Sequence, residues 1–541
     1  TNQAAQGAVA GGPPGPNSAP PSGPPTGGAP SPAFGARMAV GLLGILLAAM
    51  VSGLNNRVAG LALADVQGAL GFASDDASWL NTAYYAGELA AMPFATWFAI
   101  TFSLRRAHSW ALAIALLIAA VLPLVQNLQL LLGLRLLQGI FAGALIPMLM
   151  MSALRFLPPP IRLHGLALYA MTATLAPNVA LWLAALCVDY LDDWRLVYWH
   201  VIPLGLAAMA LVSWGIPKMP QALPRLKQGN WLGMALGMPG LALVAVGLDQ
   251  GVRLDWLHSP LIAAALFGGI ALTTLFLLSE WWHPAPFMKL QMLGRRNLGL
   301  GFTIFFCLLI TMSTGVGLPA NVLGHMHGFR MPELAAIGLT VGLPQLVLGS
   351  MVALLLYQRW VDARHLFALG LLCIAAACWI GAGMTSEWMV AQLRWATVLQ
   401  MLGQPLAVVS MLFLGTSVVA PMEGAYVSGI INTLRALGTV FGGAVIGQLM
   451  AVRGRFHSEM LLDQAARQLG RPDTSGIPLD GLARIVAEQS SVLAAADIYR
   501  IFAVLALLLI PFVLSLQYIP APTTPQAPHP APAGAPATAT P

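Results

Sequence analysis

The sequence predicts an all-α polytopic membrane protein. Of its 541 residues, 58% are hydrophobic and only 9% are charged, whereas soluble proteins carry about 25% charged residues. The apolar residues gather in segments long enough to cross a bilayer, which takes about 20 residues per helix. Open sheets cannot satisfy their backbone in lipid, so we expect these segments to be helices.

Two tails flank the apolar part of the chain. Residues 1–37 are rich in Pro, Gly and Ala, and residues 519–541 are rich in Pro and Ala. Such compositions are typical of disorder, because they cannot form a packed core. The first tail has no compact apolar region behind a basic one, so it is not a secretory signal.

Fourteen apolar segments lie between the tails, and each is a predicted transmembrane helix. Their approximate ranges are 38–64, 77–100, 109–126, 129–153, 164–188, 196–216, 231–249, 260–280, 298–319, 333–357, 365–384, 393–418, 425–451 and 499–518.

The distribution of Lys and Arg predicts that both termini are cytoplasmic. Cytoplasmic loops of membrane proteins are enriched in these residues. With the N-terminus inside, the short outside loops hold only Arg195, Arg253, Arg330 and Arg394. The inside loops hold Arg37, Arg105, Arg106, Arg155, Arg162, Lys218, Arg225, Lys227, Lys289, Arg295, Arg296, Arg359 and Arg364.

The longer loop 452–498 has helical periodicity and is predicted to be a small periplasmic helical cap. It would serve as a connector or as a docking surface for a partner.

Several function classes are excluded by the sequence. The basic residues are scattered singly, which argues against nucleic acid as a partner. No GxxxxGK[ST] loop is present, so an ATP-driven pump is not expected. No HExxH or Ser/His/Asp pattern suggests an enzyme, and the four cysteines show no metal-site spacing. We therefore expect no cofactor and no metal.

Four dispersed motifs give the chain a family resemblance. They are RLLQGIFAGALIP (135–147), DDWRLVYWHVIPLG (192–205), LDQGVRLDW (248–256) and NTLRALGTVFGGAVIG (432–447). In order and spacing they are similar to motifs of the major facilitator superfamily, and more narrowly of the fourteen-helix drug:proton antiporters of the EmrB/QacA type.

The resemblance implies a major facilitator fold with two six-helix bundles, at 38–216 and 298–518. Two inserted helices and their loops would occupy 217–297. Such transporters rock around a site near the bilayer midplane. The resemblance also implies proton-driven efflux of small organic compounds across a bacterial inner membrane. A periplasmic adaptor and an outer-membrane channel would be partners.

The N-terminal half departs from the family pattern in three places. Asn55 stands where the family has Asp on the first helix. The gating motif after the second helix, normally Gly-rich with an Asp, is here TWFAITFSLRRAH, and only Arg105 and Arg106 match it. The motif of the fifth helix is replaced by APNVALWLAAL (176–186).

Glu88 is the central candidate for proton coupling. It lies about 11 residues into the second segment, or roughly 16 Å deep at 1.5 Å per residue. A charge at that depth costs about 3 kcal/mol or more, so it must be neutral, paired or facing water. Glu88 would carry the coupling proton, form a static pair with an arginine, or contact only the substrate.

Arg135 and Arg57 lie at comparable depths. Arg135 belongs to the motif of the fourth helix, and the resemblance ties this position to proton transfer; helix packing is the alternative. Gln138 would share its polar face. Arg57 would neutralise Glu88 or attract an anion. Tyr84 is a candidate for an aromatic cavity wall.

On the thirteenth segment, Asn432 and Arg435 lie three residues apart on one face. We expect them to stabilise the bundle or, alternatively, to contact the substrate or an ion-pair partner. Small residues four apart allow close helix approach, which we expect for Gly139 with Gly143 and for Gly438 with Gly442.

The sequence leaves three functions open. The first is proton-coupled efflux of toxic organic compounds, with a preference for anionic or weak-acid substrates because two embedded arginines face one glutamate. The second is an uncoupled facilitator or importer. The third is a membrane scaffold or sensor that transports nothing.

Overall fold

The computed structural model describes residues 34–468 and 479–522. Within these ranges the chain forms helices and connecting segments, with no strand. Most of both predicted tails lies outside the described residues, as do residues 469–478 of the predicted periplasmic loop.

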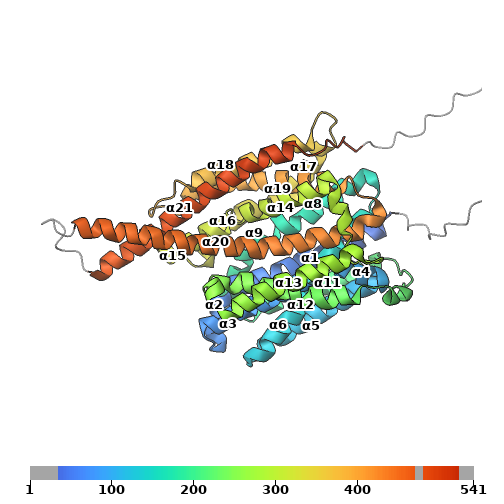
Figure 1. Cartoon of the computed structure of the whole chain (residues 1–541), viewed down its shortest axis with the longest axis horizontal. Coiled ribbons are helices and arrows are strands. Elements are labelled where there is room, and N and C mark those ends of the chain that lie inside the picture. Colours follow the sequence, from blue (N-terminus) through green and yellow to red (C-terminus); the bar gives the residue numbers. More distant parts are fainter. Residues whose placement is uncertain (1–33, 469–478, 523–541) are drawn as a thin grey trace, which may run out of the picture. The chain divides into compact units, whose positions relative to one another are not determined.

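The first part of the chain, up to residue 216, is a series of helices joined by short turns (Figure 1). They are α1 (Ala36–Leu61), α2 (Leu63–Leu70), α3 (Ser74–Ala91), α4 (Ala95–Thr101), α5 (Leu104–Val121), α6 (Leu128–Gly143), α7 (Leu145–Phe156), α8 (Pro159–Thr174), α9 (Ala176–Ala185), α10 (Leu196–Trp199) and α11 (Val201–Gly215).

The inserted pair consists of α12 (Trp231–Gly251) and α13 (Pro260–Trp282), which pack on each other. α12 also packs against α3 and α20, and Trp256 Nε1 donates a hydrogen bond to Gln448 Oε1 on α20 at 2.7 Å. The inserted pair therefore contacts both halves of the protein.

The last part of the chain is again helical. Its helices are α14 (Arg296–Met312), α15 (Gly317–His327), α16 (Met331–Gly342), α17 (Gln345–Leu356), α18 (Ala363–Gly381), α19 (Arg394–Thr416), α20 (Gly424–Gln468) and α21 (Leu479–Leu514). Short 3₁₀ or π turns complete the chain at Leu122–Leu124, Leu186–Tyr190, Leu223–Lys227 (η3), Trp256–His258, Leu290–Gly294, Val390–Leu393 and Pro421–Glu423 (η7).

Five of the predicted segments are each divided into two helices near a proline. A proline inside a helix removes a backbone hydrogen bond and its ring clashes with the preceding turn. The α8–α9 pair bends by 45° just before one of these prolines. The prolines at or next to the breaks are Pro93, Pro147, Pro177, Pro319 and Pro344.

The predicted count of fourteen transmembrane helices is not confirmed. In the described residues, twelve helices are long and apolar enough to cross a membrane, or thirteen if the bent α8–α9 pair is one span. The expected segment that does not meet this criterion of length and apolar character is 77–100. It forms α3, which carries Asp75, Asp76 and Glu88 among 18 residues, and α4, which has only seven residues.

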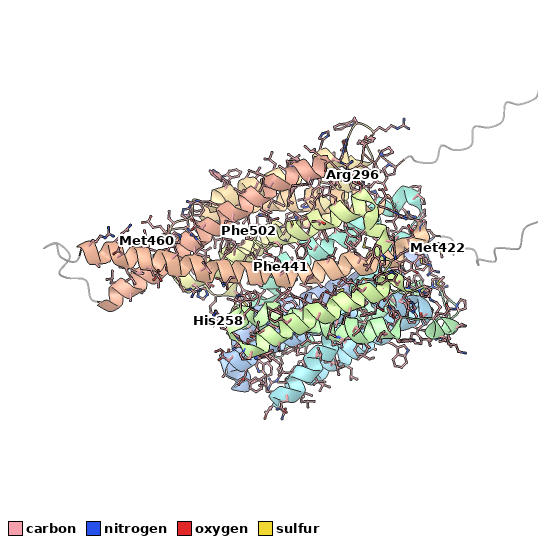
Figure 2. The ribbon with its side chains drawn as sticks, viewed as in Figure 1. His258, Arg296, Met422, Phe441, Met460 and Phe502 are labelled. Carbon is pink, nitrogen blue, oxygen red and sulfur yellow. The ribbon has the colours of Figure 1, made fainter. Side chains whose placement is uncertain are left out.

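The described part of the predicted cap, 452–498, is not a separate unit but belongs to the two long helices α20 and α21. α20 is one helix of 45 residues, about 67 Å long at 1.5 Å per residue. α20 and α21 extend side by side beyond the ends of the neighbouring helices, and Met460 marks this extension (Figures 1 and 2). Arg453 Nε donates to Asp497 Oδ2 at 2.7 Å and joins them. The extension therefore continues two long helices and is not an independent insert.

Candidate functional site

Close packing of α3 on α6 sets the positions of Glu88 on α3 and Arg135 on α6. A Cβ added at Gly139 would lie 2.2 Å from the backbone oxygen of Tyr84, and one at Gly143 would lie 2.9 Å from Glu88 Cα. Only glycine allows this approach, because both neighbours are backbone atoms. The backbones of the two helices are therefore in contact at Gly139 and Gly143, and this contact fixes where Arg135 and Glu88 lie.

Arg135 is fully buried and is held by neutral groups. Its Nη2 donates to Asn56 Oδ1 at 2.7 Å, and its Nη1 donates to Gln138 Oε1 at 2.8 Å. Its guanidinium carbon lies 4.6 Å from the ring centroid of Tyr84 and 5.6 Å from that of Tyr198. A desolvated cation–π contact contributes about 2 kcal/mol. No ion pair among the described residues includes Arg135.

The partner of Arg135 on α1 is Asn56, which the sequence reasoning missed. Asn55, the residue chosen for its place in the family motif, is also buried, but its Oδ1 has no hydrogen-bond partner among the described residues. Adjacent helical residues point about 100° apart. The two adjacent asparagines in the sequence could have indicated a polar contact on α1, but they did not show which of the two amides faces α6.

Glu88 lies on a small cavity of about 30 Å³ between the two halves of the chain. Arg57 from α1 and Arg435 from α20 line the same cavity, so one carboxyl and two guanidinium groups from α1, α3 and α20 share it. Within the described residues the Glu88 carboxyl makes no hydrogen bond and no ion pair within 4.0 Å. The space has polar walls and is large enough for about one water molecule. We call it the Glu88 cavity.

Asn432 and Arg435 connect α20 to α8, a helix of the other half. Tyr169 donates its hydroxyl hydrogen to Asn432 Oδ1 at 2.7 Å, and Arg435 Nη1 donates to Thr172 Oγ1 at 2.7 Å. The sequence suggested a stabilising role within their own bundle. The observed contacts instead cross between the halves, and Tyr169 and Thr172 were missed because nothing in their sequence context points to α20.

Gly438 and Gly442 face α14 with more room than the glycines of α6. A Cβ at Gly438 would lie 3.3 Å from Leu309 Cδ1, and one at Gly442 would lie 3.3 Å from Ser313 Oγ. These neighbours are side chains that can yield slightly. The α14–α20 contact is therefore less tight than the α3–α6 contact.

A central cavity of about 1070 Å³ occupies the space between the halves. It reaches the C-terminal ends of α1, α12 and α15 and the exposed Arg330, so it opens at that end of the helices. Its polar and charged wall residues are Asn56, Arg57, Asp65, Ser78, Asn81, Tyr85, Asn178, Asp249, Gln250, Arg253, Ser313, Asn321, His325 and Arg330.

The central cavity continues inward through shared residues. Asn56, Arg57 and Tyr85 line both the central cavity and the Glu88 cavity. A third cavity of about 80 Å³ is bounded by Arg57, Asn178, Gln404 and Arg435. Arg57 thus lines all three cavities, and its guanidinium makes no hydrogen bond or ion pair with the described residues.

The halves touch each other at the opposite end, which we call the closed end. Ser428 Oγ on α20 donates to the Pro147 carbonyl at 2.6 Å, and Thr96 Oγ1 donates to the Ala425 carbonyl at 3.0 Å. Arg105 also lies at this end, where its Nη1 donates to the Ile216 carbonyl at 3.3 Å, while Arg106 is exposed. The structure therefore does not bring these two arginines to the central cavity.

Asp249 is a further acid of the site, and it was not among the candidates from the sequence. It lines the central cavity, and its Oδ2 accepts a hydrogen bond from Thr82 on α3. Gln250 donates to the same threonine. The inserted helix α12 thus contributes an acid to the cavity wall, a role that required knowing that α12 packs on α3.

The comparisons with known proteins agree with this architecture. Residues 45–443 match the family model of the Major Facilitator Superfamily. The chain is 24% identical over 499 residues to the fatty acid resistance protein FarB of Neisseria gonorrhoeae, covering 89% of this chain and 96% of that protein. It is 23% identical over 365 residues to the multidrug export protein EmrB of Escherichia coli K12, covering 66% of this chain and 69% of that protein.

Solved structures show the same fold. The human organic anion transporter MFSD10 is 14% identical with a TM-score of 0.53, over 88% of this chain and 99% of that one. The proton:xylose symporter XylE is 12% identical with a TM-score of 0.54, over 90% of this chain and 98% of that one. Members of this family are transporters rather than enzymes. With the family model matching most of its length, this chain belongs to the Major Facilitator Superfamily.

Proposed function

We propose that this protein exports small organic compounds from the cytoplasm in exchange for protons, by alternating access. The observation that carries the proposal is the cavity open at one end only, which leads to Glu88, Arg57 and Arg435 while the halves touch at the other end. The names of the relatives, fatty acid resistance and multidrug export, support export of organic compounds.

In this mechanism Glu88 carries the proton. A proton enters through the central cavity, passes Arg57 and binds the Glu88 carboxylate. The halves then rock, the closed end opens, and the proton leaves toward the cytoplasm as substrate enters. Burial favours the neutral carboxyl and nearby guanidinium groups favour the charged one. Movement of Arg435 with α20 relative to Arg57 on α1 changes that balance between the two states.

The substrate class that fits best is anionic. Arg57 and Arg435 outnumber Glu88 around the shared cavities, and the guanidinium of Arg57 has no partner within the described residues. Guanidinium groups bind carboxylates and similar anions through paired hydrogen bonds. The apolar residues of the central cavity wall, such as Leu181, Val316 and Leu334, would hold the organic part of an amphipathic acid.

We place the protein in a bacterial inner membrane, with both termini in the cytoplasm and the central cavity facing outward. The basic residues of the loops support this orientation. From the resemblance we also expect a periplasmic adaptor and an outer-membrane channel as partners. Copurification of the intact protein from its native membrane checks that expectation, and the absence of any such partner would remove it.

The proposal is tested with inverted membrane vesicles whose interior is acidified. We expect uptake of a fluorescent aryl sulfonate, which stays ionised and crosses lipid poorly. Adding a protonophore should abolish the uptake. Uptake that survives a collapsed pH gradient would indicate a facilitator, and no uptake of any tested compound would indicate a scaffold or sensor. Either result overturns the proposal.

Substitution of Arg57 tests the preference for anions. We expect Arg57→Ala to lower sulfonate transport by about tenfold, because a lost charge-assisted hydrogen bond costs about 1.5–3 kcal/mol. Transport of a cationic dye should fall less or rise. Arg394→Ala, which removes an exposed arginine at the start of α19, is the matched control. Equal effects on anion and cation transport would contradict the assignment.

A further inference from the structure

A separate cavity of about 170 Å³ lies at the closed end of the protein. Its walls come from both halves and from the segments that flank the inserted pair: α4, α7, η3, Phe287 and the start of α20. Met422, labelled in Figure 2, belongs to it and marks this end of the helices. We call it the distal cavity. Its lining residues include Thr96, Trp97, Arg155, Arg225, Phe287 and Tyr426.

The distal cavity holds two guanidinium groups and no acid. Arg155 comes from the last turn of α7, and Arg225 comes from η3. No hydrogen bond or ion pair joins either side chain to another described residue. Arg295 at the same end differs, because its guanidinium binds both carboxylate oxygens of Glu423 at 2.8 and 2.9 Å. The Glu423 carboxylate near the start of α20 is therefore already engaged by Arg295.

Aromatic side chains hold Arg225 at the cavity wall. Its guanidinium carbon lies 5.7 Å from the ring centroid of Trp97. Trp97 is buried and packs edge-on against Phe287 with ring centroids 5.0 Å apart. The guanidinium carbon of Arg155 likewise lies over an aromatic ring, 5.8 Å from the ring centroid of Phe156. The arginines are thus supported on apolar rings, while their hydrogen-bond donors have no acceptor among the described residues.

We propose that the distal cavity binds a phosphate-bearing anion, supplied by inorganic phosphate or by the headgroup of an anionic phospholipid. Two guanidinium groups suit a phosphate, since each can donate a pair of parallel hydrogen bonds to its oxygens. Tyr426 adds a hydroxyl group to the wall, whereas the Thr96 hydroxyl already donates to the Ala425 carbonyl. In the predicted orientation this end faces the cytoplasm, where anionic lipid headgroups gather around basic protein residues.

The site also couples to the conformation of the transporter. α4 and α7 belong to one half and the start of α20 belongs to the other, so the cavity exists in this form only while the halves touch. A ligand that binds one state and not the other stabilises the first by mass action. Phosphate in the distal cavity therefore stabilises the state in which the closed end is shut and the central cavity is open.

The test uses the intact protein in nanodiscs of phosphatidylcholine, with thermal unfolding followed as inorganic phosphate is added. Sodium chloride at matched ionic strength is the reference. We expect phosphate to raise the unfolding midpoint of the wild type and to leave that of Arg225→Gln unchanged. Lys227→Gln is the matched control, because Lys227 is exposed on the same short helix and does not line the cavity. It should respond like the wild type.

A second set of nanodiscs containing phosphatidylglycerol separates the two sources. If added phosphate no longer raises the midpoint there, the lipid headgroup occupies the site; if it still does, free phosphate is the ligand. Arg155→Gln gives an independent test should Arg225→Gln fold poorly. A wild type that does not respond to phosphate in either lipid, or arginine variants that respond as fully as the wild type, would overturn the proposal.

Discussion

Glu88→Gln should bind substrate but lose gradient-driven accumulation in inverted vesicles. Glutamine keeps the shape of the side chain and cannot exchange a proton. For one proton exchanged per substrate, and with no membrane potential, each pH unit can sustain about a tenfold substrate gradient, because 1.4 kcal/mol corresponds to a factor of ten. The variant should instead reach a concentration ratio of about one, while its exchange of substrate across the membrane continues.

Glu333→Gln is the matched control, since Glu333 is exposed in the first turn of α16. It should accumulate substrate like the wild type. Substrate accumulation by Glu88→Gln at the wild-type level would show that Glu88 is not the coupling group. Asp249, the acid that α12 adds to the central cavity wall, would then be the next carboxylate to replace.

Gly139→Ala should strongly destabilise the protein or prevent its folding. The added Cβ would lie 2.2 Å from the Tyr84 oxygen and 3.0 Å from the Glu88 nitrogen, both backbone atoms. α3 and α6 would have to separate, and overpacking of this kind costs about 1–3 kcal/mol or more. Because the same contact sets the positions of Arg135 and Glu88, transport should fall even in protein that folds. Thermal unfolding of purified protein measures the first effect and vesicle uptake the second.

Gly133→Ala controls for the change of residue type on the same helix. A Cβ at Gly133 would meet nothing within 4 Å, so this substitution should stabilise α6 by about 0.5–1 kcal/mol through higher helix propensity. Similar unfolding midpoints for the two variants would mean that α3 and α6 are not held at backbone contact.

Local sequence properties predicted much of the fold. Hydropathy located the apolar segments because a bilayer accepts only long apolar stretches with a satisfied backbone. The segment 77–100 is not confirmed as a span, because Asp75, Asp76 and Glu88 lower the apolar character of α3. Hydropathy also ended the thirteenth segment at 451, although α20 continues to Gln468, because a helix that leaves the membrane becomes polar without ending.

The sequence by itself determined that three charged residues lie within long apolar segments and therefore need a special environment. Depth along a helix follows from counting residues, and this count alone places Glu88, Arg57 and Arg135 within the apolar segments. Only the tertiary structure decided their partners. The side-chain oxygen of Asn56, rather than that of Asn55, accepts a hydrogen bond from Arg135. Arg435 lines the Glu88 cavity from α20, a helix that begins at Gly424, far from Glu88 in the chain. The physical reason is that burial and periodicity are properties of one helix, whereas a hydrogen bond or a shared cavity depends on how distant helices pack.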